Sequence, residues 1–305
     1  MARYLGLDLG GTNIKAVILD DSGDVPRVIE SSSRPTMAHG GPDAVVDRIV
    51  GAGRAMLDEF GPVRGAGLGV PGLFDRATGA VMLFPNLPGP WPGHPLRDPV
   101  ARGLELPTTL INDARSFTLA EGTVGAGRGS RTLVCVTLGT GVGGGIMIDG
   151  ELHLGAWGVA GEIGHQTVVP NGPLCGCGNR GCAEALTKAD VLARLAGRAT
   201  AEDVYIGASA GDERCRSAVA TVAGYLGIAL ANTVTVLGPD RIVVGGGIVA
   251  AGEHVLGPIR QAVRNRVTLV PADEVQVVAA ALGSGAGAIG AALAASKLQV
   301  PTRSR

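Results

Sequence analysis

The sequence predicts an α/β protein made of two similar halves with a cleft between them. Three observations predict this fold class. Segments with strand-like and helix-like patterns alternate along the chain, as in sheets covered by helices. A strand, a glycine turn and a second strand occur in residues 3–20 and again in residues 132–154. The two copies align loosely, LDLGGTNIKAVILD against VTLGTGVGGGIMID, which indicates a duplicated fold.

Length and composition agree with this organisation. The 305 residues correspond to two domains of about 150 residues each. The chain has 50 glycines, which indicates many tight turns and close backbone approaches, and 46% hydrophobic residues, which is enough for an ordered core. The formal net charge of -1 indicates no basic field of the kind that holds a phosphate backbone, so nucleic acid is a poor candidate partner and we expect none.

The start of the chain and two uncharged stretches bear on membrane association. The segment YLGLDLGG lacks the basic segment and long apolar run of a signal peptide. Residues 221–238 and 275–296 are uncharged, but both are rich in small or polar residues. We therefore expect a buried helix in the first and a strand, turn and helix in the second. The prediction is a soluble, cytoplasmic protein without a membrane partner.

The elements of the first half follow in order. Residues 3–20 are expected to form a β-hairpin with an enlarged polar turn. Residues 41–61 have helical spacing, with Pro42 near the start and Gly61 after the end. The segment RGAGLGVPG predicts a short buried strand into a turn, and residues 107–125 predict a strand that runs directly into a helix.

The second half restarts the pattern. After the second strand, turn and strand at residues 132–154, helices are expected at about 184–196, 212–237 and 248–266. Strands are expected at 241–245 and 275–279, between and after these helices. This alternation is typical of a sheet covered by helices.

Two glycine turns are candidate phosphate sites. Gly10, Gly11 and Thr12 follow Asp8 in the first hairpin, and residues 138–145 form the matching turn of the second. Such turns can point several backbone N–H groups at an anion. A tight turn with nothing bound is the alternative for each turn alone, and neither fits the P-loop or dinucleotide patterns, in which the glycines open a helix. Together the turns favour nucleotide phosphates, and residues 237–252, a strand ending in three glycines, would suit the adenosine end or another phosphate contact.

Five segments resemble a known family. DLGGTNIK, LINDARSFTLAEGTVGAG, TLGTGVGGG, GEIGH and CGCGNRGCAE, in this order and spacing, resemble the ROK family of bacterial sugar kinases and related repressors, and within it the glucokinases. The resemblance runs from about residue 4 to about residue 295. It implies an actin-like ATPase or sugar-kinase fold of the ribonuclease H-like class, with ATP and Mg²⁺ between two domains, transfer of the γ-phosphoryl group to a hexose, and a structural zinc.

The resemblance also implies domain boundaries and nucleotide contacts. We expect a smaller α/β domain of residues 1–114 plus about 286–305, and a larger α/β domain of residues 115–285 that carries the zinc loop. Asp8 would reach Mg²⁺ through water, and its alternative role is to stabilise the turn. The other residues expected at ATP and its phosphates are Gly10, Gly11, Thr12, Lys15, Thr137, Gly139, Thr140, Gly141, Gly245, Gly246 and Gly247.

Asp113 is the candidate catalytic residue. It lies where a strand is expected to end and a helix to begin, a position at which Asp often serves only as a helix cap. The functional interpretation is a general base, because a sugar hydroxyl is a poor nucleophile until its proton is removed. Asn112 beside it and the family resemblance favour catalysis, with Asn112 orienting the same hydroxyl.

By resemblance, the hexose site contains Glu162, His165 and Glu184. Glu162 and His165 are three residues apart, so one helical turn would place both on the same side. A solvated surface charge is the alternative for either glutamate. Asn86 and Gly72 are further candidates, although Pro90 before Trp91 departs from the family form of the loop around Asn86.

Three clustered cysteines predict a zinc site. Cys175, Cys177 and Cys182, with His165 ten residues before the first, provide the three thiolates and one imidazole of a closed structural zinc site. A disulfide would leave one of the three unpaired in a reducing compartment, and a redox motif would need Cys-X-X-Cys. Cys135 and Cys215 are expected at core or ordinary positions, and His254 is given no role.

The leading hypothesis is an ATP-dependent hexokinase that acts on O6 of glucose, with mannose, fructose or an N-acetylhexosamine as competing substrates and polyphosphate as an alternative donor. The alternative is a sugar-sensing protein without catalysis, as in the repressors. Those carry a DNA-binding helix-turn-helix before the first strand, and here the first strand is expected by Arg3, so we expect no such domain. The partners are the hexose and ATP, and we expect a homodimer or a dimer-based homo-oligomer.

Overall fold

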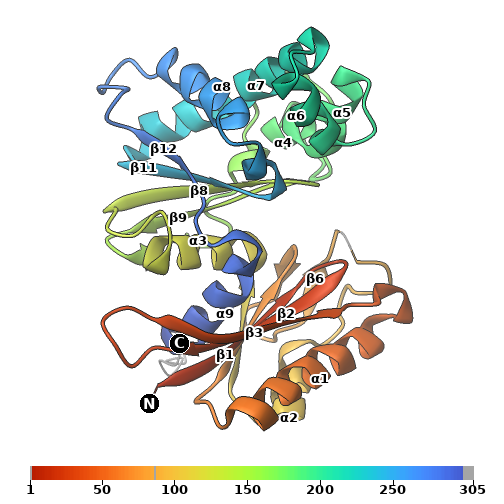
Figure 1. The fold of residues 1–305 in the computed structure, drawn as a ribbon. Coiled ribbons are helices and arrows are strands. Elements are labelled where there is room, and N and C mark those ends of the chain that lie inside the picture. Colours follow the sequence, from red (N-terminus) through yellow and green to blue (C-terminus); the bar gives the residue numbers. More distant parts are fainter. Residues whose placement is uncertain (1, 86, 298–305) are drawn as a thin grey trace. The chain divides into compact units, whose positions relative to one another are not determined.

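The computed structural model of the protein describes residues 2–85 and 87–297. The chain forms two compact units, each built on a five-stranded mixed sheet (Figure 1). Unit 1 runs from the start of the chain to Ala120 and resumes at Ser284, and unit 2 is Glu121–Gly283. Both units combine a sheet with packed helices, so the α/β fold class predicted from the sequence is confirmed.

The sheet of unit 1 has the order β3-β2-β1-β4-β7. Its hairpin of β1 and β2 is antiparallel, β3 pairs antiparallel with β2, and β4 and β7 continue the sheet parallel to β1. The strands are β1 (Arg3–Leu9), β2 (Asn13–Asp20), β3 (Arg27–Pro35), β4 (Ala66–Val70) and β7 (Thr108–Asn112), with a separate small hairpin of β5 (Leu73–Phe74) and β6 (Val81–Leu83).

The sheet of unit 2 repeats this succession of strand directions in the order β10-β9-β8-β11-β12. An antiparallel hairpin of β8 and β9 is extended antiparallel by β10 on one side and parallel by β11 and β12 on the other. The strands are β8 (Thr132–Leu138), β9 (Val142–Ile148), β10 (Glu151–Leu152), β11 (Arg241–Gly245) and β12 (Gln276–Ala279). The shared topology confirms the duplication that the glycine-turn repeat predicts.

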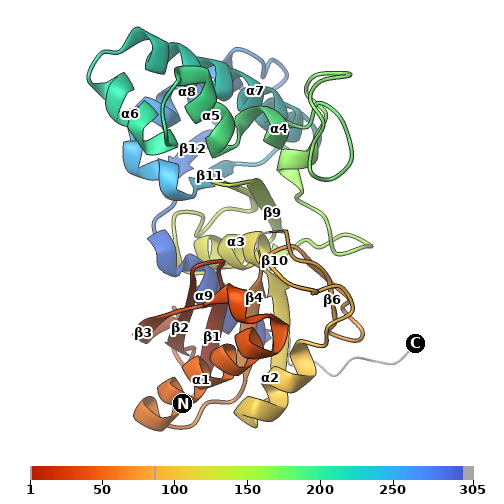
Figure 2. The same ribbon diagram turned by 90° about the vertical axis from the view of Figure 1, so that its right-hand side faces the viewer.

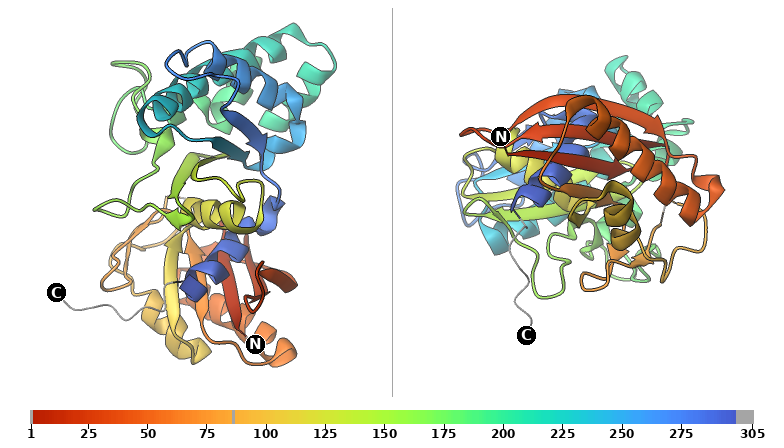
Figure 3. Two further views of the ribbon diagram at one scale, coloured as in Figure 1. Left: turned by 90° about the vertical axis from the view of Figure 1, so that its left-hand side faces the viewer. Right: turned by 90° about the horizontal axis from the view of Figure 1, so that it is seen from below.

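Helices cover both faces of the unit 1 sheet (Figures 2 and 3). The buried stripe Val45, Ile49, Ala52 and Met56 on α1 joins the same core cluster as alternate residues of β1, as expected for helical and strand periodicities of 3.6 and 2. On the opposite face α9 approaches so closely that a Cβ at Gly6 would lie 2.0 Å from Ala288 O. The helical elements are η1 (Ala38–Gly40), α1 (Pro42–Phe60), α2 (Arg97–Leu104), η4 (Gly283–Gly285) and α9 (Ala286–Lys297), while α3 (Asp113–Val124) begins in unit 1 and ends in unit 2.

The helices α4 to α8 of unit 2 gather on one side of its sheet (Figures 1 and 2). Their central member, α7, begins after Asp212, whose carboxylate accepts a hydrogen bond from Cys215 N, and ends at Gly238 in the left-handed conformation. The helical elements are η2 (Ile163–His165), α4 (Ala183–Thr187), α5 (Ala189–Ala196), α6 (Ala201–Ser209), α7 (Glu213–Leu237), η3 (Gly247–Ala251) and α8 (Glu253–Arg264).

Within the described residues, α7 is the one helix long and apolar enough to cross a membrane by length and composition. In its most apolar window 56% of the residues are buried, and twelve of its residues belong to the buried interior of unit 2. It is therefore a core helix, as the sequence predicts for residues 221–238.

Two expected helices are interrupted. The helix expected at 184–196 is the pair α4 and α5, because Lys188 between them has an extended backbone with φ -65° and ψ 160°. The helix expected at 248–266 is η3 followed by α8, because Gly252 between them has φ 57° and ψ -130°. The strand β3 and the helices α2 and α6 were not among the expected elements.

Candidate active site

The sheet of unit 1 brings the candidate catalytic residues to one edge. Because β1, β4 and β7 are parallel, their carboxyl ends lie together, with Asp8 opposite Gly69 and Val70 opposite Asn112. Gly72 joins this edge, since Asn112 Nδ2 donates a hydrogen bond to Gly72 O at 3.0 Å. The structure thus places Asp8, Gly72, Asn112 and the following residue, Asp113, on one side of unit 1.

Asn112 caps the helix that Asp113 begins. Its Oδ1 accepts hydrogen bonds from the backbone amides of Ala114 at 3.0 Å and Arg115 at 3.3 Å, which is the role of an N-cap side chain. Asp113 is the first residue of α3, and its Oδ1 accepts from the Ala114 amide at 2.8 Å. Asn112 therefore accepts the hydrogen bonds from the amides two and three residues ahead that define an N-cap, and Asp113 is not required for that role.

Asp8 and Asp113 share one electrostatic environment. Burial, together with the nearby Asp113 carboxylate, raises the pKa of Asp8 to about 6, and the Lys15 ammonium opposes the rise. Asp8 also lies against the start of α9, where a Cβ at Gly287 would stand 2.4 Å from Asp8 Oδ2. Two carboxylates close enough to interact are the arrangement that binds cations and exchanges protons.

The first glycine turn joins β1 to β2 beside Asp8. It is closed by a hydrogen bond from Gly10 N to Asn13 O at 3.0 Å. The fully buried Thr36 fixes it from the side, donating from its hydroxyl to Gly10 O at 2.7 Å and from its amide to Thr12 O at 2.8 Å. No sequence pattern indicated Thr36, because it follows β3, a strand exposed along almost its whole length and without apolar alternation.

The second glycine turn lies at the corresponding edge of the unit 2 sheet. It joins β8 to β9 and is closed by a hydrogen bond from Gly139 N to Gly141 O at 3.0 Å. Because β11 is parallel to β8, Gly245 lies opposite Thr137. Gly246 then passes so close to β8 that a Cβ would lie 2.0 Å from Leu138 O, which requires glycine at its φ of 97°.

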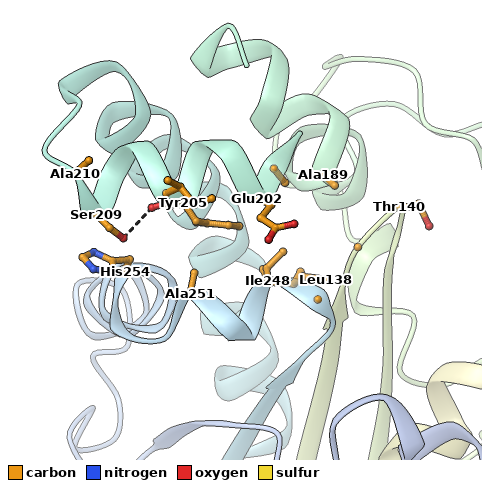
Figure 4. Close-up of a pocket in the computed structure, with 14 residues that line it drawn as sticks. Leu138, Thr140, Ala189, Glu202, Tyr205, Ser209, Ala210, Ile248, Ala251 and His254 are labelled. Atoms are coloured by element: carbon orange, nitrogen blue, oxygen red, sulfur yellow. Dashed lines mark hydrogen bonds between the residues drawn. The ribbon is translucent and has the colours of Figure 1, made fainter. Parts of the chain in front are cut away.

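A cavity of about 810 Å³ opens beside this second turn (Figure 4). Glu202 and Tyr205 of α6 face Ile248 and Ala251 of η3 across it. This volume suits a ligand of nucleotide size. The lining residues are Leu138, Gly139, Thr140, Ala189, Ala201, Glu202, Tyr205, Ile206, Ser209, Ala210, Gly247, Ile248, Ala251 and His254.

The cavity contains only part of the expected nucleotide set. Gly139, Thr140 and Gly247, three of the residues predicted to contact ATP, line it. The wall from α6 and the contribution of His254, to which the sequence assigned no role, are additional. The sequence did carry a signal for α6, since Thr200 and Asp203 form a capping box at its start.

The four candidate zinc ligands come together in unit 2. One ligand atom from each of His165, Cys175, Cys177 and Cys182 lies within 4.8 Å of all the others. His165 Nδ1 is 3.6 Å from Cys175 Sγ, and Cys177 Sγ is 3.7 Å from Cys182 Sγ, separations that a tetrahedral zinc spans. Burial raises the pKa of the Cys175 thiol to about 12, so this side chain needs a cation to become a thiolate. The donor set fits Zn²⁺.

The orientation of His165 connects the metal cluster to Glu162. Its Nδ1 faces the thiols, while Nε2 lies 3.8 Å from Glu162 Oε2. Glu162 directly precedes the single turn η2 and His165 is its last residue, so the turn predicted from their spacing does place them on one side. The Nε2 side of the ring is therefore available to a polar ligand beside Glu162.

Glu184 lies between the metal cluster and the second glycine turn. Its Oε2 accepts a hydrogen bond from the Val142 amide at 2.9 Å, and Cys175 Sγ donates to its Oε1 at 3.5 Å. A Cβ at Gly141 would stand 2.7 Å from the same carboxylate. Glu184 is thus a held carboxylate and not a solvated surface charge.

The remaining residues singled out from the sequence include the two cysteines outside the metal cluster. Cys135 in β8 and Cys215 in α7 are fully buried, as expected for core positions. Lys15 donates to Ser284 O at 2.7 Å. Asn86 lies outside the described residues.

Comparison with known proteins identifies the family. The model of the ROK family matches residues 4–297. A glucokinase of Halalkalibacterium halodurans is 36% identical and aligns over 94% of this chain and 93% of its own length. A glucokinase of Thermotoga maritima is 35% identical over 95% of this chain and 96% of its own.

Solved structures and repressors complete the comparison. The ROK family glucokinase of Streptomyces griseus, crystallised with glucose and AMPPNP, is 33% identical and superposes with a TM-score of 0.83 over 97% of this chain and 100% of its own. A xylose repressor of Caldicellulosiruptor bescii is 33% identical over 67% of this chain but only 55% of its own length. The fold is therefore that of the actin-like ROK sugar kinases, and the chain belongs to the ROK family.

Proposed function

We propose that this ROK-family chain is an ATP-dependent hexose kinase of the glucokinase type, and that glucose is its preferred substrate. The observation that carries the proposal is the pair of interacting carboxylates, Asp8 and Asp113, at one edge of the unit 1 sheet. Similarity to glucokinases along the full length of the chain supports it.

Asp113 acts as the general base. Its carboxylate accepts the proton of the hexose O6 hydroxyl while that oxygen forms its bond to the γ-phosphorus of ATP. The bond from the γ-phosphorus to the bridging oxygen breaks, and ADP leaves with that electron pair. Asn112, anchored to Gly72 O and to the start of α3, fixes the direction in which Asp113 projects.

The phosphates of ATP bind at the glycine turns. The backbone amides of the turns at residues 10–12 and 139–141 are the donors, as expected of anion-binding turns in hairpins. Asp8 would hold Mg²⁺, which neutralises phosphate charge when it is bound. The adenosine end occupies the 810 Å³ cavity between α6 and η3, with Gly245, Gly246 and Gly247 beside it.

The hexose hydroxyls are recognised by Glu162, His165 and Glu184, together with Asn112, Gly72 and Asn86. Zn²⁺ on His165, Cys175, Cys177 and Cys182 would serve as a structural ion. It would keep His165 neutral with its proton on Nε2, which makes that atom a donor to a sugar oxygen. Because ATP is the proposed donor, we expect the enzyme to act in the cytoplasm.

A hexose panel tests the proposal. Release of ADP is measured with ATP and glucose, mannose, fructose, N-acetylglucosamine or N-acetylmannosamine, and product formation is measured with polyphosphate in place of ATP. We expect glucose to give the highest kcat/KM, with ATP preferred over polyphosphate. Glucose binding by calorimetry without turnover on any sugar would contradict the kinase and support a sugar sensor of the repressor type.

A further inference from the structure

The chain passes between its two units twice. It crosses first inside α3, between Ala120 and Glu121, and it returns between Gly283 and Ser284. The two crossings differ in kind. The first is an uninterrupted helix, whereas the second is the glycine-rich turn η4.

A buried carboxylate joins the two crossings on the unit 2 side. Glu121 is completely buried, and its carboxylate accepts hydrogen bonds from three backbone amides. Oε1 accepts from Ala281 at 3.0 Å and Leu282 at 2.9 Å, which immediately precede the second crossing. Oε2 accepts from Ala126 at 2.8 Å, just beyond the end of α3. One side chain therefore ties the first crossing to the second.

The backbone around Glu121 is shaped to hold this carboxylate. The carbonyl of Glu121 accepts hydrogen bonds from Gly125 N at 3.1 Å and Gly127 N at 2.9 Å, so the chain after α3 folds back over the side chain. A Cβ at Gly125 would lie 2.2 Å from Glu121 Oε2, so only glycine fits there. The position of the carboxylate is thus fixed by packing as well as by hydrogen bonds.

The two crossing segments are also joined on the unit 1 side. Ser116, one and a half turns before Glu121 on α3, donates from Oγ to Gly287 O at 2.6 Å. Gly290 of α9 packs against the same residue, and a Cβ there would lie 1.7 Å from Ser116 O. The segments are consequently linked both before and after they pass between the units.

Gly283 is the residue free to rotate. It has a left-handed φ of 56°, and a Cβ placed on it would meet no atom within 4 Å. Glycine has the widest choice of backbone torsions, and no side chain or backbone atom packs against this position. A continuous helix and a glycine in an open turn, joined to each other by Glu121, have the composition of a hinge.

We propose that Glu121 is a positioning residue that locks the two crossings into a single hinge, about which the units close when substrates bind. The carboxylate keeps Ala281 and Leu282 beside α3, so rotation at Gly283 turns the units about one axis and returns Asp113, at the start of α3, to the same place in every turnover. The kinetic part rests on the proposed kinase function, because it requires that closure precede phosphoryl transfer.

The test compares Glu121→Gln with Thr118→Val. Glutamine keeps the shape but turns an NH₂ group toward backbone N–H donors. Thr118 is equally buried on α3, but its hydroxyl bonds only Ala114 O of its own helix, so its loss leaves the crossings joined. Hydrogen exchange measures the protection of the amides of residues 126, 281 and 282. X-ray scattering measures the change in radius of gyration on addition of glucose and a non-hydrolysable ATP analogue. Steady-state kinetics give kcat and KM.

In Glu121→Gln we expect faster exchange at all three amides, a smaller ligand-induced decrease in the radius of gyration, and kcat lower by roughly tenfold or more with glucose affinity nearly unchanged. Thr118→Val should behave as the wild type in closure and kcat. Wild-type closure and turnover in Glu121→Gln, despite the loss of amide protection, would overturn the proposal.

A second pair of variants tests the hinge even if Glu121→Gln fails to fold. Gly283→Ala disfavours the left-handed backbone at the exposed second crossing, and Gly129→Ala does the same at a position in unit 2 that is equally open, with φ 82° and no atom near its Cβ. We expect only Gly283→Ala to change closure and kcat, and identical behaviour of the two would overturn the hinge. Scattering and exchange need no turnover, so a wild type that closes without phosphorylating sugar would refute the kinase and leave the hinge standing.

Discussion

Adjacent residues with similar side chains hold different positions at the start of α3. Asn112 is the last residue of β7, and its amide group is committed to Gly72 O and to the first amides of the helix. Asp113 is inside the helix, and its charge acts on Asp8. From sequence, Asp113 was the residue for which a cap was the alternative role. The division of roles depends on the sheet register that places Asn112 opposite Val70, which residue spacing alone does not determine.

Asp113→Asn should abolish most turnover while preserving sugar binding. The amide has nearly the same shape but cannot accept the hydroxyl proton, so we expect kcat to fall by about 10² to 10⁴-fold. Steady-state kinetics and glucose calorimetry provide the two measurements, with the exposed Asp98→Asn in the same unit as a control. A variant with nearly normal kcat would show that Asp113 is only structural.

Asp8→Asn should stabilise the Mg²⁺-free protein at neutral pH. The pKa of Asp8 is raised from 3.8 to about 6, chiefly by burial, so the folded state disfavours its charged form. The folded protein binds this proton more tightly than the unfolded chain, and stability from this group is lost as pH rises from about 4 through 6. An asparagine carries no such charge.

The melting-temperature difference between Asp8→Asn and the wild type is therefore expected to be positive at pH 7.5 and smaller at pH 5. Scanning fluorimetry without added Mg²⁺ measures it at both values. A difference that grows as the pH falls would contradict the burial of an ionised Asp8.

At the scale of elements, most strands and the longest helices followed from periodicity, but breaks and exposed elements did not. The hairpins of residues 3–20 and 132–154 and the helix 212–237 carry strong apolar patterns and capping residues, and all are present. Lys188 interrupts a continuous helical pattern without glycine or proline to mark the break. The strand β3 escapes detection because its side chains are exposed, and β-strands are recognised from sequence by a buried face.

The candidate site shows the same division. The cysteine spacing was sufficient to predict the metal cluster, because four ligands lie within one short segment. The cavity wall from α6 could not be predicted, because its contact with η3 joins segments more than 35 residues apart in the chain and depends on packing. A site whose residues are close together in the sequence can be predicted from it, whereas a contact between distant segments depends on how the chain packs.

Cys177→Ala should release zinc and weaken hexose binding. We expect the KM for hexose to rise by about tenfold or more, because His165 and Glu184 are both held by the metal cluster. The KM for ATP should rise less, since Glu184 lies against only one end of the second glycine turn, at Gly141 and Val142. The variant should also melt at a lower temperature.

Metal analysis, kinetics and calorimetry measure this variant, and Cys135→Ala, a buried cysteine of the same unit outside the cluster, is the control. An intact wild type without zinc would refute the site. A zinc-free variant with unchanged hexose affinity would refute the connection between metal and sugar.

At the scale of the whole chain, the two units share their strand topology but not their functional side chains. Both units extend a hairpin with two parallel strands, yet unit 1 holds the interacting carboxylates and unit 2 holds the cavity and the metal cluster. The glycine turn is the part that both retained. A repeat in the sequence therefore predicts the same scaffold for both units, whereas each set of functional side chains has to be predicted separately.

An uncharged face of α7 bears on assembly. Thr221, Tyr225, Ile228, Asn232 and Val236 follow helical spacing, are exposed or half-buried, and lie within a stretch free of charged residues from position 217 to position 237. Val236 is 80% exposed. A neutral surface that combines apolar side chains with an amide and a hydroxyl can pair with a second copy of itself without charge repulsion.

We therefore predict a homodimer that pairs through this face, with a mass in light scattering of twice the 30.6 kDa of the chain. Asn232→Glu places a charge within the face and, through two-fold symmetry, adds a carboxylate to each of the two paired surfaces, so we expect it to shift the protein to monomers. Leu269→Glu, which replaces a residue 84% exposed on the loop after α8, controls for a general effect of added charge and should remain dimeric. A wild type with the mass of one chain would refute the dimer, and a dimeric Asn232→Glu would show that the copies pair through another surface.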